Sequence, residues 1–317
     1  MKGVFLDFST VSHNDVDPAP LGSALDEFDC HDATAPEDIA ARVKDANVIL
    51  TNKCRITRDV MEAAPDLRLV TLAATGFDNV DLDAARELNV GVTNIRAYST
   101  PSVAQHVFAL LLTLNQRLDD YRELLSSGAW KRAPNFTMLD FPIHELAGRT
   151  MGIIGYGELG HAVANIAAAF GMDVIVAERA GRDPRHGRVS FEKVIKESDV
   201  LSLHCPLNAD TRHLINANIL KQMKKSALLI NTARGAVVDE QALADALRNG
   251  DIAGAGVDVL SQEPPVDGNP LLDGDIPNLV ITPHIAWAGV EARQRAVGQM
   301  AECIREFRAG NRMNRVD

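Results

Sequence analysis

The sequence predicts an α/β protein with two parallel-sheet domains, each with helices on both faces of its sheet. The length of 317 residues exceeds what one hydrophobic core usually organises and suits two domains. Short apolar runs alternate with helical stretches from the N-terminus, and a second such series begins at Arg149. A repeated strand–helix order places the strands in parallel and the helices on both faces of the sheet.

The first series predicts the start of a small parallel sheet. Apolar runs rich in Val, Leu and Phe predict strands at 4–8, 47–52 and 67–74. Helical periodicity between these runs predicts helices at 36–46, 57–64 and 81–89.

A long helix is expected after the first series. Pro101 suits its first turn, Thr100 suits the N-cap and Gly128 suits the end, which predicts one helix over 101–128. Because such a helix is longer than most in globular proteins, we expect it to bridge domains or subunits. The segment 129–147 is rich in proline and aromatic residues and is expected to be a loop.

The second series predicts a complete doubly wound sheet of six strands, at 150–156, 173–178, 199–205, 227–233, 254–259 and 279–284. The tail 291–308 has the pattern of an amphipathic helix but no sheet of its own to cover, so we expect it to pack on the first domain. The first domain would then comprise 1–98 plus 285–317, and the second 99–284. A cleft between them would close about hinges near 95–101 and 285–289.

Composition excludes several classes of function. A net charge of −11, from 43 acidic and 32 basic residues, opposes nucleic acid and anionic membrane as partners. No apolar run approaches the roughly 18 residues that span a membrane, and Asp7 interrupts the N-terminus before a signal-peptide core can form. These features predict a cytoplasmic protein. The four cysteines form no CxxC pair, which predicts reduced, buried thiols and no zinc or other metal site.

A glycine-rich motif marks a dinucleotide site. Gly155, Gly157 and Gly160 form GYGELG between a predicted strand and a predicted helix. Gly155 permits the tight turn, Gly157 lets the backbone approach a pyrophosphate, and Gly160 lets the helix pack closely on the sheet. The amides of Glu158 and Leu159, at the start of the helix, would face the phosphates.

An acidic residue ends the next predicted strand. Glu178 lies eighteen residues past Gly160, where a carboxylate can accept hydrogen bonds from the adenosine ribose hydroxyls and repel a 2′-phosphate. This favours NAD (NADH) over NADP. Arg179 and Arg182 favour the alternative, because either could pair with a 2′-phosphate.

Three charged residues lie at or after the ends of successive predicted strands. Arg234 and Glu263 come after the strands at 227–233 and 254–259, and His284 ends the strand at 279–284. Because the carboxyl ends of parallel strands share one edge of a sheet, these side chains should lie beside the dinucleotide. They would supply a guanidinium, an acid and a proton carrier near the nicotinamide.

Over nearly its whole length the chain resembles the D-isomer-specific 2-hydroxyacid dehydrogenases. Five motifs occur in the order of that family: GIIGYGELGHAVA, HCPLNADTRHLIN, LLINTARGAVVDEQAL, GAGVDVLSQEPP and ITPHIAWA. The resemblance implies an NAD-dependent oxidoreductase acting on the CH–OH group of a D-2-hydroxy acid. It also implies two Rossmann-like domains, a flavodoxin-like substrate (catalytic) domain and an NAD-binding doubly wound domain.

The resemblance assigns a role to each charged residue. Arg234 would bind the substrate carboxylate and carbonyl, His284 would be the general acid/base, and Glu263 would be its carboxylate partner. Hydride transfer to a keto carbon leaves an alkoxide unless a proton arrives, so His284 must be protonated for reduction and neutral for oxidation. An ion pair with Glu263 favours the imidazolium form.

The resemblance also places further residues at the cofactor. Asp258 would hold the carboxamide of the nicotinamide, and the residues expected along the nicotinamide ribose and its surroundings are Pro206, Thr211, Thr232, Ala233 and His284.

The substrate carboxylate should also meet the first domain. The turn AATGFDNVD offers the backbone amides of Thr75 and Gly76 as donors. Lys53, Arg55 and Arg96 lie in loops that could face the same cleft, although surface or hinge roles suit them equally.

Finer features look like the glycerate dehydrogenase (hydroxypyruvate reductase) branch of the family. TNKCRIT, LAATGFDNVD, NIRAYSTPSVAQHV, LDFPIHELAGRTMGIIGYG and Trp287 in HIAWA carry this likeness. It implies hydroxypyruvate, with glyoxylate as a second substrate. The long helix and the 129–147 arm imply a homodimer, as in the family, and the arm could shape the pocket of a neighbouring subunit.

Three other interpretations have different signatures. Phosphoglycerate dehydrogenase remains open because Lys53 and Arg55 could bind a phosphate, but its longer forms carry a regulatory domain for which there is no room. Formate dehydrogenase has glutamine where this chain has Glu263. An NAD-binding corepressor, like the C-terminal binding proteins, would keep the same charged trio but usually has basic or disordered tails.

Overall fold

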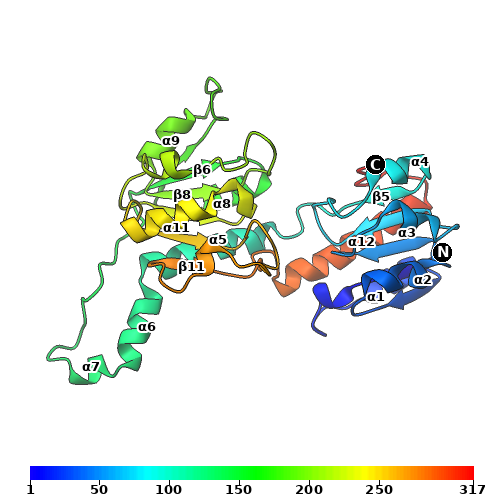
Figure 1. The fold of residues 1–317 in the computed structure, drawn as a ribbon, viewed down its shortest axis with the longest axis horizontal. Coiled ribbons are helices and arrows are strands. Elements are labelled where there is room, and N and C mark those ends of the chain that lie inside the picture. Colours follow the sequence, from blue (N-terminus) through cyan, green and yellow to red (C-terminus); the bar gives the residue numbers. More distant parts are fainter. The chain divides into compact units, whose positions relative to one another are not determined.

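The computed structural model describes residues 1–317 and divides into two compact units. One comprises Met1–Ser99 and Trp287–Asp317, and the other comprises Thr100–Ala286. Both have a parallel sheet between helices, so the α/β class with two parallel-sheet domains is confirmed (Figure 1). None of the helices combines the length and the apolarity that crossing a lipid bilayer requires.

The first unit is built on a five-stranded sheet in the order β2-β1-β3-β4-β5, the flavodoxin-like order. Its strands are β1 (Lys2–Phe5), β2 (Glu27–Cys30), β3 (Val48–Thr51), β4 (Leu69–Leu72) and β5 (Gly91–Thr93). Its helices are α1 (Ala19–Ala24), α2 (Ile39–Val43), α3 (Arg58–Glu62), α4 (Leu82–Glu87) and α12 (Val290–Arg308), with short 3-10 turns at Phe8–Thr10 and Pro36–Asp38.

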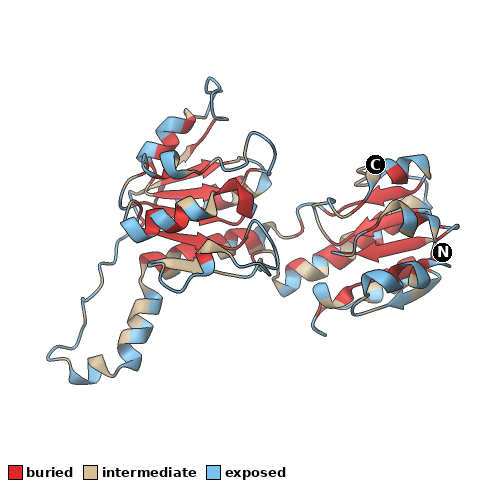
Figure 2. Cartoon of the chain, viewed as in Figure 1, coloured by how far each residue is buried: buried red, intermediate tan, exposed pale blue.

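Both faces of this sheet are buried, because successive strand residues point to opposite sides. Phe5 and Leu50 face a cluster that includes Ala296 and Met300 of α12, whereas Val4 and Ile49 face a cluster under α2, α3 and α4. Figure 2 shows the inner strands buried and the outer helix faces exposed, whereas the edge strand β2 is largely exposed. The last helix therefore covers the sheet of the first unit.

The second unit is built on a six-stranded sheet in the order β11-β10-β9-β8-β6-β7. Its strands are β6 (Thr150–Ile154), β7 (Asp173–Val176), β8 (Val200–Leu203), β9 (Leu228–Asn231), β10 (Gly254–Val257) and β11 (Leu279–Ile281). A single parallel bridge between Ala177 and Val189 continues the sheet beyond β7. The strand order thus reverses between β6 and β8, which is where doubly wound folds bind dinucleotides.

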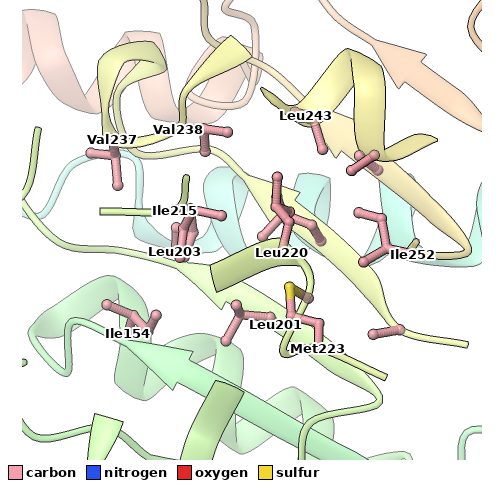
Figure 3. Close-up of a cluster of buried hydrophobic side chains, with 14 of the residues drawn as sticks. Ile154, Leu201, Leu203, Ile215, Leu220, Met223, Val237, Val238, Leu243 and Ile252 are labelled. Carbon is pink, nitrogen blue, oxygen red and sulfur yellow. The ribbon is translucent and has the colours of Figure 1, made fainter. Parts of the chain in front are cut away.

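Helices cover both faces of this second sheet. They are α5 (Thr100–Asn115), α6 (Leu118–Ser126), α7 (Ala129–Arg132), α8 (Glu158–Ala169), α9 (Phe191–Glu197), α10 (Ala217–Leu220) and α11 (Glu240–Asn249), with 3-10 turns at Gly235–Val237 and Pro270–Leu272. α5 and α8 pack on one face. Figure 3 shows the apolar cluster on the other face, where Leu201 and Leu203 of β8 meet Leu220 of α10 and Leu243 of α11.

The long helix expected over 101–128 is wrong, because the chain forms two helices that meet at Arg117. Arg117 has the left-handed backbone conformation (φ 55°), and its guanidinium binds Asp120 at 2.7 Å and Asn278 at 2.6 Å. α5 has one buried face, whereas no residue of α6 is buried. The chain therefore changes direction at Arg117, where α5 leaves the core, and α6 and α7 project from the unit (Figure 1).

Four free cysteines are present, and Cys205 and Cys303 are buried. Burial raises the pKa of the Cys205 thiol to about 11. Cys30 is exposed at the edge strand β2 and Cys54 is half-buried, so the expectation that all the thiols are buried is wrong for these two.

Candidate active site

The glycine-rich turn connects β6 to α8, and two of its glycines have no room for a side chain. Gly155 has a φ of 91°, and a Cβ there would lie 2.5 Å from the carbonyl carbon of His204. A Cβ on Gly160 would lie 2.2 Å from the carbonyl oxygen of Gly155. A Cβ on Gly157 would meet nothing within 4 Å, so this glycine faces open space. A phosphate can therefore approach the backbone at Gly157.

The start of α8, next to the glycine-rich turn, provides backbone amides that can attract an anion. Gly157 is the N-cap of α8, and the amides of Glu158 and Leu159 lie in its first turn without a backbone acceptor. Such amides attract an anionic pyrophosphate. Glu158 also accepts a hydrogen bond from the Thr100 hydroxyl, which ties α8 to the start of α5.

A second feature that suits a dinucleotide cofactor lies just after β9. The hydroxyl of Thr232 is buried and has no hydrogen-bond partner within the chain, and Ala233 beside it is also buried. Native proteins rarely leave a buried hydroxyl unpaired. Together with the open glycine cradle, this hydroxyl fits a dinucleotide cofactor along the carboxyl edge of the sheet.

The loop after β8 is held by its own side chains. The Thr211 hydroxyl donates to the Pro206 carbonyl oxygen at 2.6 Å and accepts from the amide of Asn208 at 2.8 Å. Thr211 therefore shapes the turn that begins with Pro206. The expected contact of both residues with the cofactor stays a prediction.

Glu178, just after β7, is only 3% exposed. Arg185 binds its carboxylate with two hydrogen bonds, from Nε at 2.6 Å and from Nη2 at 2.7 Å. This guanidinium lowers the pKa of the Glu178 carboxyl to about 2. Glu178 is therefore charged at neutral pH, and its contact with the ribose stays a prediction.

The charged trio follows three neighbouring strands, β9, β10 and β11. The structure brings two of its members into contact, since Nδ1 of His284 lies 2.6 Å from Oε2 of Glu263. The other oxygen of Glu263 accepts the amide of Leu260 at 2.8 Å, which orients the carboxylate. Nε2 of His284 has no partner within the chain, and the imidazole is about one-third exposed. His284 can thus offer Nε2 to a ligand while Nδ1 is held.

The backbone at His284 is unusual and is fixed by Asp258. His284 has a φ of 55°, and its amide donates to the Asp258 carbonyl oxygen at 2.8 Å. The Asp258 carboxylate accepts the amides of Ile285 and Ala286, each at 2.9 Å. Asp258 is 1% exposed. This carboxylate therefore positions the loop that carries His284, and its expected contact with the carboxamide stays a prediction.

Two further residues complete this support, and the sequence analysis missed both. Thr282 donates a hydrogen bond to Asp258, and Nε2 of His106 lies 2.8 Å from the Thr282 hydroxyl. Burial alone would raise the pKa of Asp258, but the hydrogen bonds from His106, Thr282 and the two amides bring it below its usual value. The only sequence signal for Thr282 is its place in the TPH motif.

Arg234 is the member of the trio with no ion-pair partner. Its guanidinium is exposed, donates only to the carbonyl oxygen of Ala233 at 2.7 Å, and has no carboxylate within 4.0 Å. The next residue, Gly235, packs so closely that a Cβ there would lie 1.9 Å from the carbonyl carbon of Leu260. Arg234 is therefore anchored beside the segment that leads to Glu263, and its charge is available to an anion.

In the first unit, the turn after β4 leaves donors unused. The backbone amides of Thr75 and Gly76 donate no hydrogen bond within the chain, whereas the Thr75 hydroxyl donates to Ile95 O at 2.9 Å and Asn94 donates to Thr75 O at 2.7 Å. The turn is thus held while two amides stay available. This geometry suits a carboxylate.

A buried carboxylate organises the loop that carries Lys53. Asp7 is 4% exposed and accepts hydrogen bonds from the Thr51 hydroxyl and from the amides of Asn52, Lys53 and Cys54, at 2.7–3.2 Å. The Lys53 side chain is exposed. Asp7 was not identified from the sequence, because nothing local distinguishes it from a carboxylate at the end of a strand.

Of the remaining expected residues of this unit, two lie at its surface and Trp287 is half-buried against the core. Arg55 and Arg96 are exposed, and Arg96 donates weakly to Asn94 at 3.4 Å. Trp287 packs edge-on against Tyr98 with ring centroids 6.4 Å apart. Their roles toward substrate stay predictions.

His204, beside Gly155, should make the protein less stable in acid. Its Nδ1 is buried without a partner, and burial lowers the pKa of the imidazole from 6.5 to about 4. The unfolded chain therefore takes up a proton below pH 6.5 that the folded chain refuses until about pH 4. Between these values the free energy of unfolding should fall by about 3 kcal/mol on account of this group.

Urea unfolding of wild type and His204→Gln at pH 6.5 and pH 4 measures this contribution. Glutamine can keep the hydrogen bond with Ser202 (2.8 Å) but does not titrate. We expect the variant to lose less stability over this interval than wild type does. Equal losses would show that His204 is not buried in its neutral form.

The fold and the site define a dinucleotide-dependent oxidoreductase. Residues 108–286 match the family model of the D-isomer specific 2-hydroxyacid dehydrogenase NAD binding domain. The chain belongs to the D-isomer specific 2-hydroxyacid dehydrogenase family, as the sequence motifs predicted.

Named relatives agree with this assignment. The chain is 44% identical to glycerate dehydrogenase of Methylorubrum extorquens over 282 residues, covering 89% of each chain. It is 37% identical to hydroxypyruvate reductase of Blautia hydrogenotrophica, covering 100% of each chain. The crystal structure of the TT0316 protein from Thermus thermophilus matches with a TM-score of 0.86 at 34% identity, covering 100% of both chains.

Proposed function

We propose that this chain reduces hydroxypyruvate to D-glycerate with NADH, and that it also reduces glyoxylate as a second substrate. The contact between Nδ1 of His284 and Glu263, at 2.6 Å, carries the chemical part of the proposal. The names of the relatives, glycerate dehydrogenase and hydroxypyruvate reductase, support the choice of substrate. Other D-2-hydroxy acids, and phosphoglycerate in particular, are the alternatives.

His284 is the proton donor in this proposal. The bound nicotinamide supplies a hydride to the keto carbon, and the carbonyl oxygen then needs one proton. Because Glu263 holds Nδ1, the proton on Nε2 faces outward and can pass to that oxygen. The imidazolium becomes neutral as the hydroxyl forms, and solvent restores its proton before the next turnover.

Arg234 and the Thr75–Gly76 turn hold the substrate in this proposal. The planar guanidinium of Arg234 can bind the carboxylate and polarise the carbonyl, since no acid of the chain neutralises it. The two amides of the turn donate no hydrogen bond within the chain, so they are suited to a carboxylate. Lys53 and Trp287 would contact the rest of the substrate.

NADH is the proposed cofactor. The Gly157 cradle and the first turn of α8 fit a pyrophosphate, and the unpaired Thr232 hydroxyl fits a group lying past β9. Glu178 lies just after β7, where the adenosine ribose is expected, and Arg185 binds its carboxylate. A carboxylate at this position favours NADH over NADPH.

Product analysis tests the proposal. Purified protein with hydroxypyruvate and NADH should form glycerate of the D configuration, in amounts equal to the NADH consumed. Formation of L-glycerate would contradict the assignment of the site. If neither hydroxypyruvate, glyoxylate, pyruvate nor phosphohydroxypyruvate is reduced, the NAD-binding corepressor becomes the better interpretation.

We further propose that the chain forms a homodimer through α6 and the 129–147 arm, which together follow α5. Several large apolar side chains are exposed there, including Trp130 (54%), Phe136 (90%) and Leu139 (86%). Exposed apolar side chains that lie close together along one segment are typical of an interface. The arm has little of its own core, since no residue of α6 or α7 is buried.

Leu139→Glu should therefore shift the protein from dimer to monomer. A charge buried in an apolar interface costs several kcal/mol, enough to lower the association constant by about 10²-fold or more. Sedimentation equilibrium of wild type and variant measures the change, and Val266→Glu, exposed to 77% in the loop after Glu263, is the matched control. A wild-type protein that is monomeric at all concentrations would contradict the proposal.

A further inference from the structure

The carboxylate of Glu178 has no unused acceptor position. Its Oε1 accepts the amide of Arg179 at 2.9 Å and Nη2 of Arg185 at 2.7 Å, and its Oε2 accepts Nε of Arg185 at 2.6 Å and the amide of Arg185 at 3.3 Å. A carboxylate has about four lone-pair positions. A ribose hydroxyl can therefore bind Glu178 only if it displaces one of these donors.

The donor that can leave is the Arg185 side chain. It is 63% exposed, whereas Glu178 is 3% exposed, so the guanidinium covers the carboxylate from the solvent side. Nη1 of Arg185 donates no hydrogen bond within the chain, whereas Nε and Nη2 both bind Glu178. The same side chain can thus cancel the charge of Glu178 and still donate to an anion.

The surrounding loop adds positive charge. Arg179 and Arg182 follow Glu178 and are exposed, and Arg188 lies three residues after Arg185 and donates to the Ala177 carbonyl oxygen at 3.3 Å. Arg179 and Arg182 have no carboxylate within 4.0 Å. With Glu178 neutralised by Arg185, the loop carries a net positive charge.

We propose that Arg185 sets the cofactor specificity of this chain, by masking Glu178 so that NADPH is accepted beside NADH. The inference rests on the proposed cofactor site and deepens it. A free carboxylate would repel the 2′-phosphate of NADPH, but the paired one does not, and Nη1 offers that phosphate a charge-assisted hydrogen bond. NADH gains the Glu178–ribose bond only by displacing the Arg185 fork.

The proposal predicts opposite effects of one substitution on the two cofactors. Arg185→Ala should weaken NADPH binding, because it removes a donor and exposes the charge of Glu178. It should strengthen NADH binding, because Glu178 is then free to accept the ribose hydroxyl. We expect the ratio of the NADPH to the NADH dissociation constant to rise by about 10-fold or more.

Two further variants separate this mechanism from a general loss of charge. A third changes Glu178, the partner of Arg185, in place of Arg185 itself. Arg185→Lys keeps the charge but loses the planar fork, so the ratio should rise only in part. Arg182→Ala removes a charge from the same loop without touching Glu178, and should weaken NADPH without strengthening NADH. Glu178→Gln should strengthen NADPH, because Arg185 is then released toward the phosphate.

Dissociation constants are measured by quenching of protein fluorescence with NADH and NADPH, without any keto acid. Because this measurement needs no turnover, it tests the inference independently of the proposed reaction. If the proposed reaction is wrong, turnover is absent but both dissociation constants can still be measured. The inference is overturned if Arg185→Ala leaves the ratio unchanged, or if wild type binds NADPH too weakly to measure while NADH binds normally.

Discussion

His284→Asn is expected to lose about 10²–10⁴-fold of the hydroxypyruvate reduction rate while NADH still binds. The loss follows from the missing proton donor, since asparagine cannot protonate the developing alkoxide. Asparagine is chosen because His284 has a φ of 55°, a conformation that asparagine tolerates better than alanine does. Steady-state kcat with hydroxypyruvate and the dissociation constant of NADH are the two measurements.

Glu263→Gln is the companion variant, because glutamine can keep a hydrogen bond at Nδ1 without the charge. It should lose less rate than His284→Asn, because the imidazole that can pass a proton to the carbonyl oxygen is still present. Turnover of His284→Asn equal to wild type would remove His284 as the proton donor.

Arg234→Lys is expected to lower kcat/KM for hydroxypyruvate by about 10²–10³-fold, or about 3–4 kcal/mol. Lysine keeps the charge but cannot hold a carboxylate and polarise a carbonyl with one planar group. The guanidinium of Arg234 has no carboxylate of the chain within 4.0 Å, so its charge is available to the substrate. We therefore expect a large effect on kcat/KM. NADH affinity should stay the same.

Arg86→Lys is the matched control for this prediction. Its guanidinium is 52% exposed and pairs only with Asp83, three residues away on α4. The kinetic constants of this variant should equal those of wild type. If Arg234→Lys also behaves as wild type, the substrate carboxylate is held elsewhere.

Strands buried on both faces could be predicted from the sequence. β3, β4, β6, β8, β9 and β10 are nearly continuous apolar runs, and each lies where the sequence analysis expected it, as do the partly buried edge strands β7 and β11. β2 (Glu27–Cys30) was missed because it is an edge strand with mostly exposed residues, and β5 (Gly91–Thr93) because it has only three residues and begins with glycine.

The bend at Arg117 could not be predicted, because no glycine or proline marks it. The two helices follow one another with unbroken periodicity in the sequence. What ends α5 is a left-handed residue held by Asp120, close in sequence, and by Asn278, 161 positions away. A partner that distant leaves no local signal.

The site could be predicted as far as its motifs reach. The contact of His284 with Glu263 follows from strand ends that share one edge. The supports of these residues could not be predicted, because His106 reaches Thr282 across 176 positions and Asp7 holds a loop 44 to 47 positions away. Arg185 is one of four arginines in a short run, and only the fold shows which one binds Glu178.

The most direct test of the proposed function compares four keto acids side by side with NADH. Hydroxypyruvate, glyoxylate, pyruvate and phosphohydroxypyruvate each have the carboxylate and carbonyl that Arg234 and His284 require, and they differ only beyond the keto carbon. We expect kcat/KM to be highest for hydroxypyruvate and second for glyoxylate. A higher value for phosphohydroxypyruvate or pyruvate would contradict the assignment of the substrate, and no turnover with any of the four would contradict the proposed reaction.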